Sequence, residues 1–260
     1  MSEPKQSRPK GTQDFVPPDS ERRRRAEDTF RSLAETYGYR EIITPTFEHT
    51  AVFVKSSGET SDIVTKEMFS FKDHSGRDLT LRAEGTPCVA RAVLENQVRL
   101  PARLYYVGPF FRYVRPQKGR YREFYQVGVE ALGEASPLSD AEVISFGSTF
   151  LESLGVRDCV TQVNSIGCRE CRPAHREALR KFLVDRREQL CEDCKLRIER
   201  NPLRVFDCKV ETCRQAVKDA PTPRQYLCPA CQKHLEEVLE GLDRHGLRYE
   251  MNDRLVRGLD

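Results

Sequence analysis

The chain has 260 residues, of which 38% are hydrophobic and 32% are charged, and its net charge is +3. A chain of this size and composition forms one large or two modest globular domains with cores of their own. It has no apolar run near the ~20 residues of a membrane span, and Met1–Lys10 lacks the apolar region of a secretory signal. We therefore expect a soluble protein of the cytoplasm with no membrane partner.

The nearly balanced net charge does not predict a nucleic-acid binder, so a local patch must carry that argument. Residues 112–122 supply one, because they include Arg112, Arg115, Lys118, Arg120 and Arg122 and no acidic side chain. Such a loop is typical of a segment that contacts phosphate groups.

The first expected element is a helix that begins at a Ser20 cap and ends at Gly38. Its apolar side chains recur at helical spacing: Ala26, Phe30, Leu33, Ala34 and Tyr37. Short strands are expected over 40–44 and 79–83. Thr86 and Pro87 then resemble the N-cap and first residue of a helix that runs to Glu95.

Two longer strands, 104–113 and 123–132, are expected on either side of the basic loop. A helix over 138–154 follows, with Ser139 as its cap and Gly155 as its stop, and then a strand over 160–164.

The composition changes at Cys168, after which the chain is helical, charged and rich in cysteine, and strand character returns at 249–251. We interpret this as a subdomain inserted into a sheet-based domain. The expected limits are 1–167 for the core, 168–246 for the insertion and 247–260 for a truncated return to the core.

Strand alternation places Phe124, Gln126, Gly128 and Glu130 on one face of the second long strand. One alternative is that this face simply points to solvent. The other is a ligand site, favoured because glycines at 108 and 128 leave open space and because the face combines an aromatic ring, an amide and a carboxylate. Glu84-Gly85-Thr86 lies at a strand end, where it could grip an amino group or where Thr86 could only cap the helix.

Eight of the ten cysteines lie in four pairs: Cys168/Cys171, Cys191/Cys194, Cys208/Cys213 and Cys228/Cys231. Three pairs have the Cys-x-x-Cys spacing that lets two thiolates reach one tetrahedral Zn²⁺. Eight ligands suffice for two sites, although the sequence does not give the pairing. Our choice for a structural zinc site is Cys191, Cys194, Cys228 and Cys231.

The alternative to zinc is a set of reduced thiols packed in a small core. We expect His175 and His234 to lie on helix surfaces, and the alternative is that they serve as additional metal ligands. We expect Cys88 and Cys159 to be small buried residues.

Five segments in this order resemble the histidyl-tRNA synthetase family of class II aminoacyl-tRNA synthetases. They are Pro9–Asp14, Tyr37–Pro45 (similar to motif 1, which makes dimer contacts), Leu81–Thr86, Phe111–Phe124 (similar to motif 2) and Leu255–Asp260. The resemblance implies an α+β fold in which an antiparallel sheet is flanked by helices. It also implies a homodimer, and a chain that stops inside a motif and lacks motif 3 and the anticodon-binding domain.

The resemblance also implies a reaction in which histidine and ATP, with Mg²⁺, give histidyl-adenylate, and the histidine then passes to tRNA(His). Arg112 and Arg257 would act on the reacting carboxylate and α-phosphate. Histidine would further be held by Glu84, Thr86, Gln126 and Glu130, and ATP by Arg120, Glu123 and Phe124. The tRNA acceptor end would meet Arg115, Gln117 and Lys118.

Two departures and two alternatives accompany this interpretation. Ala83 and Pro87 differ from the residues expected beside Glu84-Gly85-Thr86, and the motif breaks off at Asp260. The first alternative is the histidine-binding regulatory subunit of ATP phosphoribosyltransferase, which shares the catalytic-domain fold. The second is a zinc-ribbon RNA-binding or assembly module without enzyme activity.

Overall fold

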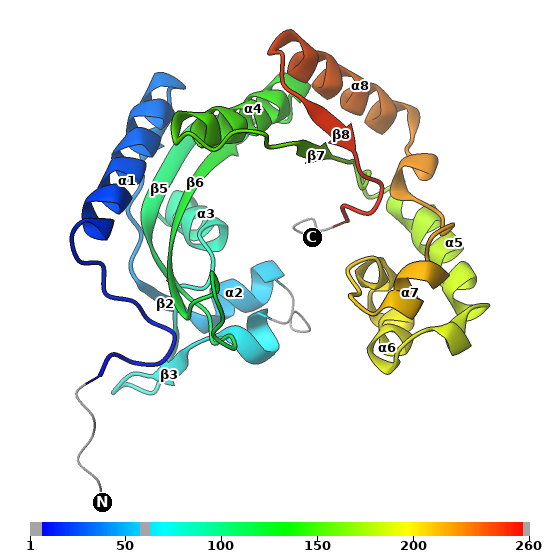
Figure 1. Cartoon of the computed structure of the whole chain (residues 1–260), viewed down its shortest axis with the longest axis horizontal. Helices are drawn as coiled ribbons and strands as arrows, with labels where there is room; N and C mark the ends of the chain where they lie inside the picture. The colour runs from blue at the N-terminus through cyan, green and yellow to red at the C-terminus, as the bar shows by residue number, and fades with distance from the viewer. Residues whose placement is uncertain (1–6, 58–62, 257–260) are drawn as a thin grey trace, which may run out of the picture. The chain divides into compact units, whose positions relative to one another are not determined.

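The computed structural model describes residues 7–57 and 63–256 (Figure 1). The chain divides into two compact units. The first runs to residue 134 and includes residues 153–155, and the second holds residues 135–152 and the chain from residue 156 onward. Among the described residues, no helix is both long and apolar enough to cross a bilayer.

The first unit is built on a sheet with the strand order β1-β5-β6: β1 (Arg40–Glu41), β5 (Ala102–Phe111) and β6 (Glu123–Leu132). β5 and β6 form a long antiparallel hairpin whose register runs from Ala102 opposite Leu132 to Phe111 opposite Glu123. β1 is parallel to β5. The basic loop therefore joins the two strand ends at one tip of the hairpin.

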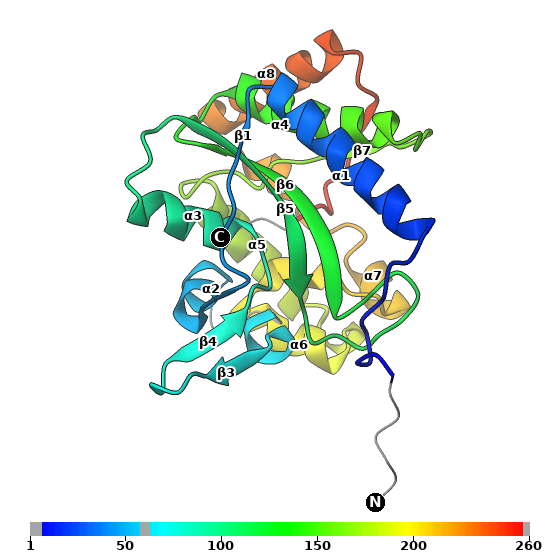
Figure 2. The ribbon, with the colours of Figure 1, turned by 90° about the vertical axis from the view of Figure 1, so that its left-hand side faces the viewer.

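Helices cover both faces of this hairpin, as Figures 1 and 2 show. α1 (Asp19–Thr36) lies on one face, where the Phe30 ring meets Tyr105 edge-on at 6.1 Å between centroids. α3 (Thr86–Glu95) lies on the other, where Val89 and Val93 form a buried cluster with residues of β5. The face that carries Gln126 and Glu130 is thus the one directed to α3, and it is not a solvent face.

A smaller antiparallel sheet in the same unit has the order β2-β4-β3: β2 (Phe47–His49), β4 (Asp78–Leu81) and β3 (Ser70–Lys72). α2 (Thr50–Ser57) continues from β2, and a short π-helical turn, η1, spans Ile63–Glu67. The Thr80 hydroxyl lies within hydrogen-bond distance of Thr50 and Ser70, at 2.8 and 2.9 Å.

The second unit has two cores. In the first, α4 (Pro137–Ser153) and α8 (Pro229–Arg244) pack with a parallel strand pair, β7 (Thr161–Val163) and β8 (Tyr249–Met251), around Ala141, Val163, Val238 and Leu242. Because β7 and β8 pair directly, the chain between them is inserted between two neighbouring strands.

The second core belongs to the short helices of that inserted chain: α5 (Arg172–Val184), α6 (Glu192–Arg200) and α7 (Glu211–Ala216), with 3₁₀ turns η2 (Arg187–Gln189), η3 (Pro202–Val205) and η4 (Pro223–Tyr226). Leu179, Leu183 and Ile198 are fully buried in it, together with Cys194 and Cys213. Thiols are therefore part of the packed interior of this unit.

The predicted α+β fold is confirmed, and the long strands, the helices and the strand at 249–251 lie where the sequence placed them. Two details differ. The strand expected over 40–44 is only two residues long, because the Thr44 carbonyl accepts a bond from the Arg82 side chain rather than from a strand. Ser20 and Ser139 lie inside their helices and are not N-caps.

Candidate functional site

The hairpin face that looks toward α3 gathers most of the predicted histidine-site residues. On β6, Gln126 stands opposite Gly108 and Glu130 opposite Leu104, while Tyr106 of β5 stands opposite Gly128. The Tyr106 ring fills the space above two glycines, since a Cβ atom at Gly85 or Gly128 would collide with it.

Gly108 and Gly128 therefore do not leave space for a ligand, contrary to the sequence-based interpretation. The Arg82 guanidinium occupies the space beside Gly108, and Tyr106 occupies that beside Gly128. Both glycines are needed because protein side chains cross the strands there.

Glu130 is a mostly buried carboxylate that accepts a hydrogen bond of 2.6 Å from Thr86 Oγ1. Burial raises the pKa of Glu130 above its ordinary value, and the Thr86 hydrogen bond opposes that rise. Thr86 does not cap α3, because Gly85 holds the N-cap position and no side-chain cap bond forms there. The hydroxyl at the start of α3 is thus directed to the hairpin.

Tyr106 links the remaining members of this face, and sequence reasoning missed it. Its hydroxyl accepts a 2.8 Å hydrogen bond from Gln126 Nε2. Burial, and then the nearby Glu130 carboxylate, raise the pKa of Tyr106 to about 12, so the phenol is neutral. The signal available in the sequence was strand alternation, which places the large Tyr106 ring on the same face of its strand as Gly108.

Arg112 lies just beyond β5 and is aimed by three contacts. Its Nε donates to the Ala83 carbonyl at 3.0 Å, its Nη2 lies 3.5 Å from Glu84 Oε1, and its guanidinium lies 5.4 Å from the centre of the Phe124 ring. Both ionic side chains are partly exposed, at 31% and 19%. The structure thus brings Glu84, Arg112 and Phe124 together, with Glu123 next to Phe124 at the start of β6.

The loop between β5 and β6 turns at Gly119, whose φ of +76° favours glycine. Gln117 and Arg120 form a short antiparallel bridge, and Arg120 Nη2 lies 3.0 Å from Glu67 Oε1 of η1. The predicted tRNA-contacting side chains are all exposed on this loop: Arg115, Gln117 and Lys118.

A hollow of about 410 Å³ lies between this loop and residues 8–12, and Lys10 and Lys118 are among its lining residues. Arg122 holds the two segments together: its backbone N–H donates to the Gly11 carbonyl at 2.7 Å, and its guanidinium lies 3.9 Å above the Tyr113 ring. The N-terminal segment and the basic loop thus form one positively charged surface.

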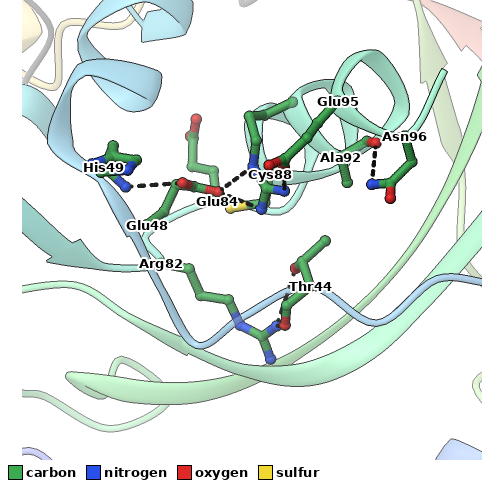
Figure 3. A network of polar contacts seen from close by, with 10 residues as sticks. Thr44, Glu48, His49, Arg82, Glu84, Cys88, Ala92, Glu95 and Asn96 are labelled. Atoms are coloured by element: carbon green, nitrogen blue, oxygen red, sulfur yellow. Dashed lines mark hydrogen bonds and ion pairs between the residues drawn. The ribbon is translucent and has the colours of Figure 1, made fainter.

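A network of buried charges supports the site from beneath (Figure 3). Arg82 is 7% exposed; it donates to the carbonyls of Thr44 and Pro109, and burial lowers its pKa. Glu48, 6% exposed, accepts from Arg91 of α3 at 2.6 Å. From the sequence, Arg82 was considered only as part of the Leu81–Thr86 segment. A charged residue in the apolar run around β4 was nevertheless a signal that Arg82 makes buried hydrogen bonds.

Arg257, the second predicted catalytic arginine, lies outside the described residues.

The eight clustered cysteines form two groups of four. The first cysteine group is Cys168, Cys171, Cys228 and Cys231, and the second cysteine group is Cys191, Cys194, Cys208 and Cys213. Within each group the sulfur atoms all lie within 4.8 Å of one another, so each could hold a metal ion. The single site expected from Cys191, Cys194, Cys228 and Cys231 is wrong, because its two pairs belong to different groups.

Four other expectations, for two histidines and the two remaining cysteines, have mixed outcomes. His175 is buried, and its Nε2 lies 2.8 Å from the Pro221 carbonyl, so it is neither a surface residue nor a member of a cysteine group. His234 is a surface residue, as expected, and pairs with Asp140 at 2.8 Å. Cys88 is buried, as expected, but Cys159 is exposed.

Comparisons with known proteins show which family the chain resembles. The profile of the histidyl-tRNA synthetase family matches residues 11–185. The histidine–tRNA ligase of Moorella thermoacetica is 50% identical over 257 residues, which are 98% of this chain and 61% of that protein. The crystal structure of apo S. aureus histidyl-tRNA synthetase is 34% identical with a TM-score of 0.76, over 98% of this chain and 58% of that one.

A third protein bears on the alternative function. A structure described as an ATP phosphoribosyltransferase regulatory subunit/histidyl-tRNA synthetase from Bacillus halodurans C is 21% identical with a TM-score of 0.66, over 97% of this chain and 69% of that one. At that identity the likeness concerns the fold alone. The chain spans about three fifths of the length of the curated relatives it matches. With its family profile covering more than half of the sequence, the chain belongs to the histidyl-tRNA synthetase family.

Proposed function

We propose that this chain is the N-terminal catalytic portion of a histidine–tRNA ligase, which activates histidine with ATP and transfers it to tRNA(His). The observation that carries the proposal is the polar face on the hairpin, which gathers the half-buried Glu130, Thr86 and Gln126, together with the Arg112–Glu84 pair at the end of β5. A solvent-facing strand would not direct these groups toward a helix.

Glu130 is the proposed reader of the imidazole ring. It receives one hydrogen bond from Thr86, whereas a carboxylate can accept about four, so it retains capacity for an imidazole N–H. An amino acid with an apolar side chain of similar size would leave this half-buried carboxylate without a hydrogen-bond partner. The site should therefore bind such an amino acid much more weakly than histidine.

The α-amino group would be held by Glu84, Thr86 and Gln126. Thr86 donates its hydroxyl proton to Glu130, and Gln126 donates an amide N–H to Tyr106. The oxygen atoms of both side chains can therefore accept hydrogen bonds from the ligand. An ammonium group donates three hydrogen bonds, which these acceptors and the Glu84 carboxylate match.

The same proposal assigns the ATP contacts. Arg112 would bridge the histidine carboxylate and the α-phosphate, where it stabilises the charge that develops during attack on phosphorus. Arg120 would reach the outer phosphates, Phe124 would stack on adenine, and Glu123 would contact the adenine amino group. Mg²⁺ would be held chiefly by the phosphates and would neutralise their charge.

Arg257, outside the described residues, is proposed to act on the same carboxylate and phosphate from the opposite side. Catalysis would come from positioning and charge stabilisation, with no protein nucleophile. The first step gives histidyl-adenylate and pyrophosphate, and the second gives histidyl-tRNA and AMP.

The tRNA acceptor end would bind the surface formed by residues 8–12 and the loop, through Arg115, Gln117 and Lys118. We propose that the protein is a homodimer whose interface includes the motif 1 region. Exposed apolar side chains there support this, since Ile43 is 85% exposed and Phe47 is 52% exposed. Since the reaction uses tRNA and ATP, we place it in the cytoplasm.

For the cysteine-rich segment we propose an inserted subdomain with limits 168–246 that holds structural Zn²⁺. Pairing of β7 with β8 across this segment supports the insertion, and sulfur-only ligand groups support zinc. None of the eight cysteines belongs to the proposed histidine or ATP site, so this metal would take no part in catalysis.

Histidine-dependent exchange of pyrophosphate into ATP, measured with the full-length protein, tests the main proposal. We expect exchange with histidine and none with phenylalanine or leucine. Histidine binding without any exchange would overturn the ligase proposal and favour a histidine-sensing protein like the regulatory subunit.

A further inference from the structure

The two cysteine groups connect different parts of the chain. The first cysteine group joins the segment just before α5 to the start of α8, because Cys171 is the residue before α5 and Cys228 the residue before α8. The second cysteine group lies wholly between these points: Cys191 immediately precedes α6, Cys194 lies on α6, Cys213 lies on α7, and Cys208 lies in the segment that joins the two helices.

The first cysteine group has the features of a built ligand cage. The Cys228 backbone N–H donates to Cys171 Sγ at 3.1 Å, and the Glu170 N–H donates to Cys168 Sγ at 3.4 Å. Backbone donors of this kind orient metal-bound sulfurs and offset their charge. Gly167, with φ of +71°, allows the close turn, because a Cβ there would lie 2.7 Å from Cys171 Cβ.

The second cysteine group is more enclosed. Cys194 and Cys213 are both 0% exposed, and the Cys191 N–H donates to Cys213 Sγ at 3.1 Å. The Arg197 guanidinium lies 3.9 Å from Cys194 Sγ and also donates to the Arg204 carbonyl. A cation held at that place favours the negative charge of a four-thiolate metal site.

The sulfur separations agree with tetrahedral zinc and not with disulfides. A Zn–S bond of about 2.3 Å places tetrahedral sulfurs about 3.8 Å apart. Cys168 and Cys171 sulfurs are 3.5 Å apart, and Cys191 and Cys208 sulfurs are 3.9 Å apart. A disulfide would bring two sulfurs to about 2.05 Å.

We propose that the two groups are two separate four-thiolate zinc sites with different mechanical roles. The first site ties together the two ends of the inserted segment, joining residues 57 positions apart such as Cys171 and Cys228. The second site holds α6 and α7 together inside the segment, across 22 positions from Cys191 to Cys213. The inference deepens the zinc part of the proposed function and does not depend on ligase activity.

Different roles follow from this connectivity. A cross-link that closes a long loop removes more freedom from the unfolded chain than one that closes a short loop. The first site limits the separation of α5 from α8, whereas the second site lies inside the core of the segment, where Cys194 and Cys213 are buried among its apolar side chains. Loss of one site should therefore leave the other site loaded.

Metal content of the full-length protein, purified without added zinc, tests the stoichiometry. We expect two Zn²⁺ per chain in the unmodified protein and in Cys159→Ser, a matched control at an exposed cysteine outside both groups. Cys168→Ser/Cys228→Ser and Cys191→Ser/Cys208→Ser should each retain one. One zinc or none in the unmodified protein, or loss of both ions in both double variants, would overturn the proposal.

Hydrogen exchange locates the effect of each loss and guards against a variant that merely unfolds. Cys168→Ser/Cys228→Ser should speed exchange at residues 167–172 and 226–232 and leave α6 and α7 protected, and Cys191→Ser/Cys208→Ser should do the reverse. Identical exchange maps for the two variants would contradict separate roles. Thiol titration of the unmodified protein adds a test without substitutions: a chelator should make eight further thiols reactive, and no change on chelation would refute zinc binding.

Discussion

The hairpin site and the cysteine-rich segment are held in shape by different forces. In the first unit, two ten-residue strands and a helix on each face hold Gln126 and Glu130 in register, and neighbouring side chains provide their hydrogen bonds. In the second unit, short helices surround a small core in which the thiols of Cys194 and Cys213 are buried among leucine, isoleucine and valine side chains. The comparison teaches that strand pairing, hydrogen bonds and an apolar cluster against α3 hold the first region, whereas we expect the second region to depend also on the proposed zinc cross-links.

The largest expected effect on the hairpin site comes from Arg112→Ala. Removal of a cation that stabilises developing charge should lower the rate of histidine-dependent pyrophosphate exchange about 100-fold or more. The second unit should keep its zinc. Arg99→Ala, at an exposed position, is the control and should keep the wild-type rate. Equal rates for the two variants would separate Arg112 from the chemistry.

Removal of zinc with a chelator should affect the second unit and leave the hairpin site intact, the opposite of Arg112→Ala. Removal of zinc should unfold the α5–α7 core, because a structural zinc site contributes folding free energy directly. Histidine affinity should change little, since the hairpin and α3 carry no zinc ligand. Circular dichroism and calorimetric titration, made on one chelated sample, measure both. If the chelated protein lost histidine binding but kept its helices, the claim that zinc stabilises the second unit and not the hairpin site would be contradicted.

The hairpin was predictable from sequence for a physical reason. Strand side chains alternate with a period of two, so Phe124, Gln126, Gly128 and Glu130 had to share a face once the strand was assigned. The polar partner across the strands was not predictable without the register, and Tyr106 was therefore missed. For the same reason, the prediction that Gly108 and Gly128 leave space for a ligand was wrong, because the Arg82 and Tyr106 side chains fill that space.

The cysteine pairing was not predictable, because spacing along the chain shows which thiols are neighbours but not which pairs meet. Cys191 and Cys194 lie at the start of α6 and join Cys208 and Cys213, whereas the pair at the start of α8 joins Cys168 and Cys171. Those contacts depend on how α5, α6 and α7 fold back on one another. No local pattern in the sequence encodes that arrangement.

A glycine substitution tests the packing that aims the site. Gly128→Ala should destabilise the first unit by about 1–3 kcal/mol, because the added methyl group collides with the Tyr106 ring. Gly147→Ala is the matched control: it lies in α4, a Cβ there meets nothing within 4 Å, and alanine favours a helix. Urea unfolding followed by tyrosine fluorescence measures both. A Gly128→Ala protein as stable as the control would show that Tyr106 can move aside.

The smallest effect concerns pH. Burial raises the pKa of Glu130, so ionising this side chain costs more in the folded protein than in the unfolded chain. Its contribution to stability is therefore greatest below its unfolded pKa and is lost as pH rises through the raised folded pKa. Glu130→Gln, which resembles the protonated form, should be slightly more stable than wild type at pH 7 and should bind histidine less tightly. Unfolding midpoints of both proteins at pH 4 and pH 7 give the result, and a Glu130→Gln protein that is less stable at pH 7 would contradict it.

The central claim is that the half-buried carboxylate of Glu130 selects histidine, and calorimetric titration of histidine into the full-length protein tests it most directly. Glu130→Ala should weaken histidine binding about 100-fold, since a charge-assisted hydrogen bond contributes up to about 3 kcal/mol. Glu134→Ala removes a partly exposed carboxylate from the same stretch of chain and should bind as wild type does. Equal histidine affinity in Glu130→Ala and Glu134→Ala would contradict the claim.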